Sequence, residues 1–282
     1  MSSYVDVNIQ LEKLVELFKQ KNWLEIEGSD TKIKRCQQLL RRFNSPDEQK
    51  LILDMLRRFN VVDYTNYYSC FNEIFHRINV IEGAWFQNLK KIAIVPLLKP
   101  KSIEKNEMKS SRFIWYLLKN VNFFGYMVFD NKTVSFIDVA EKGKISALNR
   151  NNQVFLVDDY IGSGDTAISA IEHLINNGVD NYKITVVAIA TQREGIEALK
   201  QYGVRFYYLE SVSKAITDEY PETERECALE LMRTIEGRYG GINRTYSLGY
   251  KQSEALWSLI RTPNNTLPIF WLKNTAPFER KK

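Results

Sequence analysis

Apolar residues recur at helical spacing through the first 88 residues. Four segments carry the pattern, near residues 11–18, 33–40, 51–59 and 64–78. Ser45 and Pro46 precede the third segment at the positions that favour an N-cap and a first helical turn. The pattern therefore predicts a helical N-terminal domain over residues 1–88.

From about residue 91 the pattern changes to short apolar runs that alternate with helical segments. The runs that predict strands cover residues 92–95, 123–129, 134–139, 154–157, 184–190 and 204–209. Helical spacing lies between them, at 109–120, from 165 onward and at 193–201. Alternation of this kind is typical of an α/β fold whose parallel sheet is covered on both faces. We expect this core to span residues 89–210.

The remaining residues, 211–282, are expected to form a C-terminal extension that packs on the core. Helical spacing is found at 222–236 and again at 252–261. Two asparagines between Pro263 and Pro268 predict a stiff turn, and the apolar residues 269–271 after it predict a short strand.

Composition narrows the class of protein. The chain has 282 residues, of which 44% are hydrophobic and 26% charged, as in an ordinary globular protein. No apolar run has the length of a membrane span, and residues 1–10 lack the pattern of a secretory signal, so we expect a cytoplasmic protein without membrane contact. The net charge of +5 is compatible with phosphate-rich ligands or with nucleic acid.

The cysteines and histidines argue against a disulfide-stabilised protein and against a zinc protein. Cys36, Cys70 and Cys227 are scattered and odd in number, which favours a reducing compartment over a disulfide framework. His76 and His173 have no Cys or His at ligand spacing, which argues against a zinc site.

The segment 154–167 carries the clearest chemical signal. An apolar run, residues 154–157, leads into Asp158 and Asp159, and the small residues Gly162, Ser163 and Gly164 follow before helical spacing begins. Glycines let the backbone turn tightly and approach a ligand, and the first amides of a helix attract an anion. Carboxylates next to such a site can accept hydrogen bonds from sugar hydroxyls or bind a hard cation such as magnesium.

Three known kinds of phosphate-binding loop are candidates for this segment. The P-loop of ATPases requires a lysine where Asp165 stands, which excludes it. Gly162, Gly164 and Ala167 fit the dinucleotide fingerprint formally, but the next predicted strand leads into the uncharged Thr191 and Gln192, where that motif expects an acid.

The third loop also explains the two acids. The segment resembles the signature of type I phosphoribosyltransferases, which consists of four apolar residues, two acids, two apolar residues and a Thr/Ser-Gly-x-Thr loop. The matching residues are Asp158, Asp159, Ile161, Ser163, Gly164 and Thr166. Tyr160 is larger than the usual aliphatic residue, and Asp165 adds a negative charge in the loop.

The resemblance implies binding of 5-phosphoribosyl-1-pyrophosphate (PRPP) together with Mg²⁺. Asp158 and Asp159 would hold the ribose hydroxyls, directly or through the metal, and are the implied catalytic residues. The loop from Gly162 to Thr166, Asp165 included, would surround the 5′-phosphate. Lys99, Lys101 and Ser102, in the loop after the first core strand, would meet the pyrophosphate, although a plain surface role for the two lysines stays open.

Two parts of the family pattern are weak in this chain. The turn at 130–132 is shorter than the flexible loop that often covers the site in these enzymes, although residues 141–152 offer a substitute. No base-binding hood is evident. The leading helices and the tail are similar to phosphoribosyltransferase-like proteins of bacterial anti-phage systems.

Three functions follow from these observations. The chain is a phosphoribosyltransferase, a non-catalytic PRPP or nucleotide sensor that regulates a partner protein, or a defence effector that acts on nucleotides or nucleic acid. The two acids favour the first and third, and the weak lid and hood favour the second. A partner protein from the same gene system is expected in the defence setting.

Overall fold

The computed structural model describes residues 2–105, 108–120, 129–139 and 144–280. The chain groups into two compact units, one formed by residues 1–63 and 213–282 and the other by residues 64–212. The three-domain division at 88/89 and 210/211 stays a prediction. In the structure, residues 64–88 belong to the same unit as the sheet, and residues 213–282 belong with the first helices.

The unit made from the two ends of the chain is mostly helical, as the apolar spacing predicts for its first part. Its elements are α1 (Ser2–Gln20), η1 (Trp23–Glu25), α2 (Ser29–Arg41), α3 (Pro46–Arg58), β1 (Asn60–Val61), α11 (Glu222–Tyr239), η6 (Arg244–Tyr246), β7 (Trp257–Ser258) and η7 (Pro268–Phe270). Strands β1 and β7 pair in parallel and thereby join the two segments.

Aromatic side chains from both segments form the centre of this unit. Phe59 and Phe278 are stacked with ring centroids 4.2 Å apart, and Trp23 meets Phe278 edge-on at 5.5 Å. Phe270 contacts Phe59 at 5.2 Å. Because aromatic pairs contribute beyond the area that they bury, this cluster ties residues 23–59 to residues 270–278.

Two predictions for the tail are wrong. Residues 252–261 form turns and β7 instead of a helix, and residues 268–270 form the 3₁₀ helix η7 instead of leading into a strand. Leu248, Lys251, Gln252 and Glu254 have positive φ angles between 49° and 58°, which no right-handed helix accommodates. The buried Glu254 carboxylate accepts the amides of residues 216 and 217, both at 2.8 Å, and so holds this turn.

The second unit contains the expected α/β core. Its strands are β2 (Lys91–Pro96), β3 (Thr133–Phe136), β4 (Gln153–Ile161), β5 (Ile184–Gln192) and β6 (Arg205–Val212). They form a five-stranded sheet in the order β3-β2-β4-β5-β6, in which every pairing is parallel. Residues 123–128 of the strand predicted at 123–129 and the first residues of the substitute lid, 141–143, lie outside the described residues.

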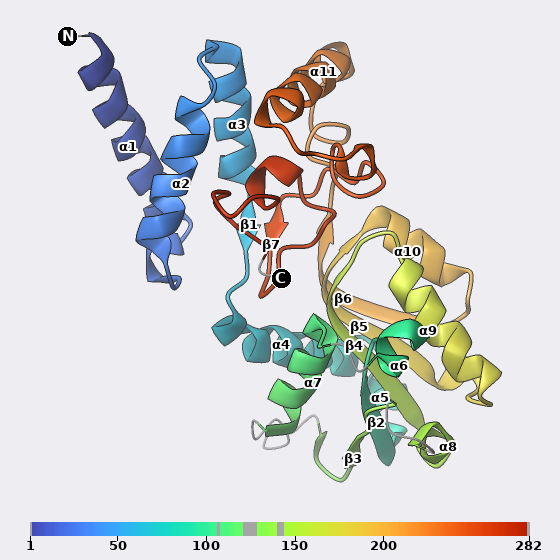
Figure 1. Cartoon of the computed structure of the whole chain (residues 1–282). Coiled ribbons are helices and arrows are strands. Elements are labelled where there is room, and N and C mark those ends of the chain that lie inside the picture. The colour runs from blue at the N-terminus through green and yellow to red at the C-terminus, as the bar shows by residue number, and fades with distance from the viewer. Residues whose placement is uncertain (1, 106–107, 121–128, 140–143, 281–282) are drawn as a thin grey trace. The chain divides into compact units, whose positions relative to one another are not determined.

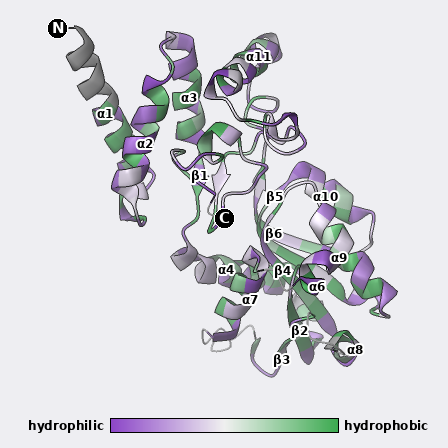
Figure 2. Cartoon of the chain, viewed as in Figure 1, coloured by the Kyte–Doolittle hydropathy of each residue, from purple (hydrophilic) through white to green (hydrophobic). Residues whose placement is uncertain are grey.

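Helices cover both faces of this sheet (Figure 1). They are α4 (Tyr67–Ile81), α5 (Gly83–Asn88), α6 (Pro100–Glu104), α7 (Ser110–Asn120), α8 (Lys144–Leu148), α9 (Asp165–Asn176) and α10 (Arg193–Lys200), with the short turns η2 (Tyr64–Asn66) and η5 (Asn181–Lys183). Phe155 of β4 packs on Phe75 of α4, whereas Leu156 shares a cluster with Ile171 of α9. Figure 2 shows hydrophilic and hydrophobic residues mixed along α9 and α10, as expected of helices with one buried side.

The strand order places the switch point of the sheet between β2 and β4. From β2 the chain continues to β3 at one edge of the sheet, and from β4 it continues to β5 and β6 toward the other edge. Open parallel sheets bind ligands at such a point, outside the carboxyl ends of the strands. No helix of the described residues combines the length and apolarity that a membrane crossing requires.

A glycine in α10 allows this helix to pack directly on the loop after β4. A Cβ atom added at Gly195 would lie 2.5 Å from the carbonyl oxygen of Gly162 and 2.9 Å from a methyl group of Ile161. Gly164, with φ +82°, would bring a Cβ to 3.0 Å from Ala198. The loop and the helix therefore fit together only because both positions lack side chains.

We predict that Gly195→Ala destabilises the protein by roughly 1–3 kcal/mol, because the new methyl group meets a backbone carbonyl that cannot move cheaply. Urea-induced unfolding measures the effect. Gly83→Ala is the matched control in the same unit, since a Cβ there has no atom within 4 Å. Equal stability of the two variants would contradict the close approach.

Candidate functional site

Strand β4 is longer than the apolar run that predicts it. It extends through both acids to Ile161 and pairs with β5 as far as the Ile161–Thr191 register. The hydroxyl of Thr191 also donates a hydrogen bond to the carbonyl oxygen of Ile161 at 3.1 Å. Although successive strand residues point to opposite faces, the carboxyl groups of Asp158 and Asp159 remain close enough to interact with each other and with Ser110.

Asp159 points toward the face covered by α4. Its side chain is only 4% exposed, and its Oδ2 accepts a hydrogen bond from the hydroxyl of the fully buried Tyr67 at 2.9 Å. Phe113 of α7 contacts the Tyr67 ring edge-on at 6.4 Å. In this structure Asp159 is therefore an internal residue of the site.

Asp158 is the more accessible of the two acids and is half-buried. Its Oδ1 accepts the hydroxyl of Ser110 at 3.1 Å and the backbone amide of Asp159 at 2.9 Å. Ser110 is the first residue of α7. The contact joins the carboxyl end of β4 to the start of a helix that also packs on β2.

Both carboxyl groups are harder to ionise than an ordinary aspartic acid. Burial raises the pKa of Asp158 well above its usual value, and the neighbouring charge of Asp159 raises it further. Burial also raises the pKa of Asp159, while the hydrogen bond from Tyr67 opposes that rise. Perturbed carboxyl groups of this kind are concentrated at functional sites.

The loop after β4 has the geometry that the glycines predict. Gly164 adopts the left-handed conformation and is the N-cap of α9, which begins at Asp165. Glycine has no side chain, so no N-cap side chain occupies the start of α9. Thr166 is exposed, and Gly162, Ser163 and Asp165 are half-buried, so this loop is within reach of a ligand.

The predicted pyrophosphate residues lie after the neighbouring strand β2. Lys99 is the N-cap of α6, and the backbone amide of Ser102 donates to its carbonyl oxygen at 2.9 Å. Lys99 and Lys101 are exposed, while Ser102 is half-buried. Helix α6 packs on α9, so these residues and the glycine loop lie at the same edge of the sheet.

Sequence reasoning missed three residues of the site. Tyr67 lies 92 positions before the acid that it contacts, and nothing near it in the sequence indicates this role. Ser110 stands before an apolar helical pattern, where a hydroxyl residue is a recognisable helix start. Gly195 interrupts a helical pattern, and such an isolated glycine often marks a close approach.

A magnesium ion at this site would need a phosphorylated ligand to complete its coordination. Among the described residues, no group of three or more His, Cys, Asp or Glu side chains could hold a metal ion. Mg²⁺ is usually bound by one or two carboxylates plus waters and substrate phosphates. Asp158 would supply such a carboxylate, and a bound cation would favour its ionised form.

The arrangement thus combines a carboxylate, backbone amides at a helix start and nearby lysines at one edge of a parallel sheet. Amides and lysines attract phosphate oxygens. A half-buried carboxylate accepts hydrogen bonds from hydroxyl groups. A molecule that carries both a phosphate and free hydroxyls matches this set of groups.

Similar solved structures include orotate phosphoribosyltransferases. The enzyme from Aeropyrum pernix is 17% identical over 51% of this chain and 70% of its own, with a TM-score of 0.31. The Mycobacterium tuberculosis H37Rv enzyme in complex with PRPP is 12% identical over 61% of this chain and 93% of its own, with a TM-score of 0.34. Its complex with inorganic phosphate has the same identity and a TM-score of 0.32, over 61% and 92% of the two chains.

The family comparison covers most of the chain. A family model described as PRTase-CE matches residues 36–280, which include the acids, the glycine loop and large parts of both units. The chain therefore belongs to the PRTase-CE family.

Proposed function

We propose that the unit of residues 64–212 binds a phosphorylated ribose, in the first place PRPP, at the carboxyl edge of its sheet. The observation that carries this proposal is the position of the half-buried Asp158 directly before the glycine loop and α9, at the switch point of the sheet. A carboxylate alone would repel a phosphate, whereas a carboxylate for the sugar and amides for the phosphate suit one ligand.

The phosphate end is assigned to the loop. The backbone amides from Gly162 to Thr166 and the hydroxyls of Ser163 and Thr166 surround the 5′-phosphate in this proposal. Asp165 adds a negative charge there, which its place in the first turn of α9 partly offsets. Lys99, Lys101 and Ser102 meet the pyrophosphate from the loop after β2.

The sugar end is assigned to the acids. Asp158 accepts hydrogen bonds from the ribose hydroxyls, and these bonds stabilise its ionised form, which burial disfavours. Asp159 is buried beside Asp158 and accepts a hydrogen bond from the hydroxyl of Tyr67. Magnesium bound with the ligand would neutralise the charge of the leaving pyrophosphate.

In the transferase version of this function, a nucleophile displaces pyrophosphate from the anomeric carbon and its proton leaves to solvent. The negative charge of Asp158 favours the positive charge that develops on the sugar. A PRPP sensor is a second candidate, because Tyr67 encloses Asp159 and only one acid is accessible. Release of pyrophosphate in the presence of nucleobases distinguishes the two, since a sensor binds PRPP without turnover.

We also propose that the protein takes part in a bacterial defence system together with a partner protein. This part of the proposal rests on the sequence resemblance. Infection assays test it directly. Loss of phage protection in Asp158→Ala, at unchanged protein level, supports the role, and full protection by that variant rejects it.

We predict that Asp158→Asn weakens PRPP binding at least about tenfold, since a hydrogen bond to a charged group contributes roughly 1.5–3 kcal/mol. Calorimetry with PRPP, with and without Mg²⁺, measures the loss. Glu197→Gln is the matched control, because it removes one acidic charge from an exposed ion pair of α10. Unchanged affinity in Asp158→Asn would refute the assignment of the sugar end.

The same Asp158→Asn variant is expected to be more stable than the wild type without ligand. The raised pKa means that the folded state keeps its proton to a higher pH than the unfolded state. Wild-type stability therefore falls as the pH rises above the ordinary range of aspartic acid, near pH 4. Asparagine removes this loss, so we expect Tm to increase at pH 8 and to increase by less at pH 5. A decrease at pH 8 would contradict the buried-charge argument.

We predict that Tyr67→Phe shifts the pH dependence of PRPP binding to lower pH. The substitution keeps the ring and removes the hydrogen bond that lowers the pKa of Asp159. Asp159 then stays neutral to a higher pH, and because its negative charge raises the pKa of Asp158, Asp158 ionises and binds the ribose at lower pH. Titrations between pH 5 and 9 locate the midpoint. Tyr202→Phe, which removes an exposed bond to Glu172, should leave the midpoint unchanged.

A further inference from the structure

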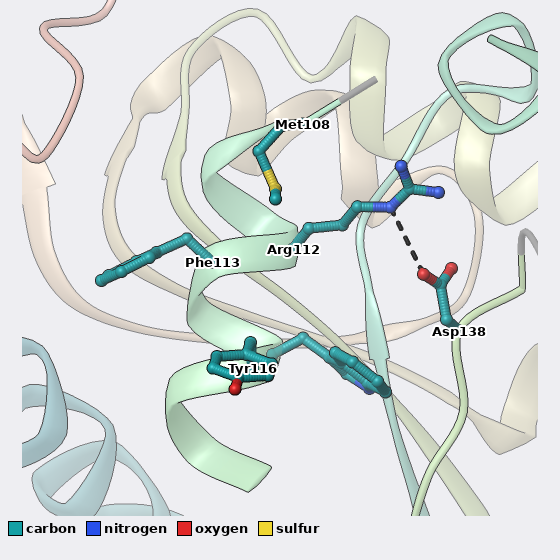
Figure 3. Close-up of a pocket in the computed structure, with 6 residues that line it drawn as sticks. Met108, Arg112, Phe113, Tyr116 and Asp138 are labelled. Atoms are coloured by element: carbon teal, nitrogen blue, oxygen red, sulfur yellow. Dashed lines mark ion pairs between the residues drawn. The ribbon is translucent and has the colours of Figure 1, made fainter. Parts of the chain in front are cut away.

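The cavity along α7 belongs to the candidate site already described. Its volume is about 380 Å³, and Figure 3 shows the residues that line it, which are Met108, Arg112, Phe113, Trp115, Tyr116 and Asp138. Ser110, on the same helix, donates to Asp158. Phe113 contacts Tyr67, which in turn donates to Asp159. A different surface lies in the unit formed by the two ends of the chain, within residues 244–280.

The backbone of residues 248–254 is strained. Leu248, Lys251, Gln252 and Glu254 have φ angles between 49° and 58°, and Gly249 has a φ angle of 82°. Residues other than glycine disfavour this left-handed conformation, and residues that are held in it are concentrated at functional sites. A plain connection between η6 and β7 does not require such a run, so this loop is a candidate for a function of its own.

Two buried carboxylates hold this loop in place. Glu236 is 3% exposed and accepts the amide of Leu248 at 2.9 Å and the hydroxyl of Ser247 at 2.7 Å. Glu254 is 2% exposed and accepts the amides of residues 216 and 217. A Cβ atom added at Gly249 would collide with the carbonyl oxygen of Asn265. The loop therefore has a fixed shape, and both acids are withdrawn from its surface.

Aromatic side chains on and beside the loop form a continuous row, which consists of Tyr250, Tyr246 and Trp271. The ring centroids of Tyr250 and Tyr246 are 6.4 Å apart, and Tyr246 meets Trp271 edge-on at 5.7 Å. At one end of the row, Nζ of Lys251 lies 5.7 Å from the centroid of Tyr250. At the other end, Cζ of Arg280 lies 5.6 Å from the centroid of Trp271. Tyr246 and Tyr250 are half-buried, so part of the row faces solvent.

The charge of the segment that carries this row is positive. Residues 240–282 contain seven lysines and arginines but only two acids, a surplus as large as the net charge of +5 of the whole chain. One acid is the buried Glu254, and the other, Glu279, pairs with Arg35 at 3.3 Å. Arg244 and Lys251, in contrast, are exposed. A ligand at the aromatic row therefore meets cations, while both acids of the segment are engaged within the protein.

We propose that the aromatic row binds a single-stranded nucleic acid. Bases would stack on Tyr250 and Tyr246, and the phosphates that follow them would meet Lys251 and Arg244. Proteins that bind single strands combine aromatic rings with cations in this way. A duplex keeps its bases stacked on one another and cannot use the rings, and an acidic protein segment would use the cations alone. The inference goes beyond the proposed function, because it involves no residue of the sheet unit, 64–212.

The test is fluorescence anisotropy with the full-length protein. The labelled probes are oligo-dT and oligo-rU of about 20 nucleotides, which exceeds the length that one such binding fold covers, a DNA duplex of the same length and a poly-glutamate peptide. We expect at least one single strand to bind more tightly than the duplex and the peptide. We also expect its affinity to fall steeply with salt, because the phosphates release counterions on binding.

Two variants separate stacking from charge. Tyr250→Ala is expected to weaken single-strand binding about tenfold, the loss typical of a removed stacking partner. Lys251→Gln is expected to lower the slope of log affinity against log salt concentration by about 0.7. Because Lys251 is exposed, this variant removes a charge without removing packing. Tyr182→Ala and Lys200→Gln are the matched controls, since these side chains are 61% and 65% exposed and lie in the other unit.

Three results would overturn the inference. The first is the absence of binding by both single strands at micromolar protein concentration in low salt. The second is equal or tighter binding of the duplex or of the peptide, which would assign the surface to double-stranded DNA or to an acidic protein. The third is an unchanged affinity in Tyr250→Ala together with an unchanged salt slope in Lys251→Gln. PRPP is titrated in parallel, and because Tyr250→Ala leaves the sheet unit intact, a failure of this inference and a failure of the proposed function are seen separately.

Discussion

The pairing of β4 with its two neighbours fixes the backbone on which the candidate site is built. Pairing with β2 holds the strand as far as Val157, and pairing with β5 continues past Asp158 to Ile161. The two carboxyl groups remain close enough to interact, and the glycine loop begins at a defined place against α10. A ligand at this edge meets groups whose positions are set before it arrives, which reduces the entropic cost of binding.

The two acids lower the stability of the protein when no ligand is bound. Two neighbouring carboxyl groups are withdrawn from water, and their pKa values rise accordingly. Hydrogen bonds from Tyr67 and Ser110 offset only part of that cost. Natural proteins depart from optimal stability mainly at functional sites. Two buried acids with raised pKa values therefore indicate a functional site, whereas a well-packed apolar residue indicates only stability.

Local signals predicted the larger part of the fold. Apolar runs located the described strands, and Gly164 located the start of α9, because each signal acts within a few residues. The end of β4 was placed too early, since acids disfavour strands, whereas pairing with β5 extends the strand through Asp158. The Tyr67–Asp159 contact was not predictable, because it joins residues far apart in the sequence. In the tail, helical spacing misled because Glu254 holds a turn through contacts that the spacing does not encode.

The unit made from two separated segments has a consequence for synthesis. Chains emerge from the ribosome in order, and units fold as they become complete. The residues of the sheet unit, 64–212, are all present before Phe270 and Phe278 are made, whereas Trp23 and Phe59 must wait for both. The early helices therefore expose an incomplete aromatic cluster throughout the translation of the sheet. Nascent chains at this stage are the form of the protein most exposed to aggregation and to chaperone binding.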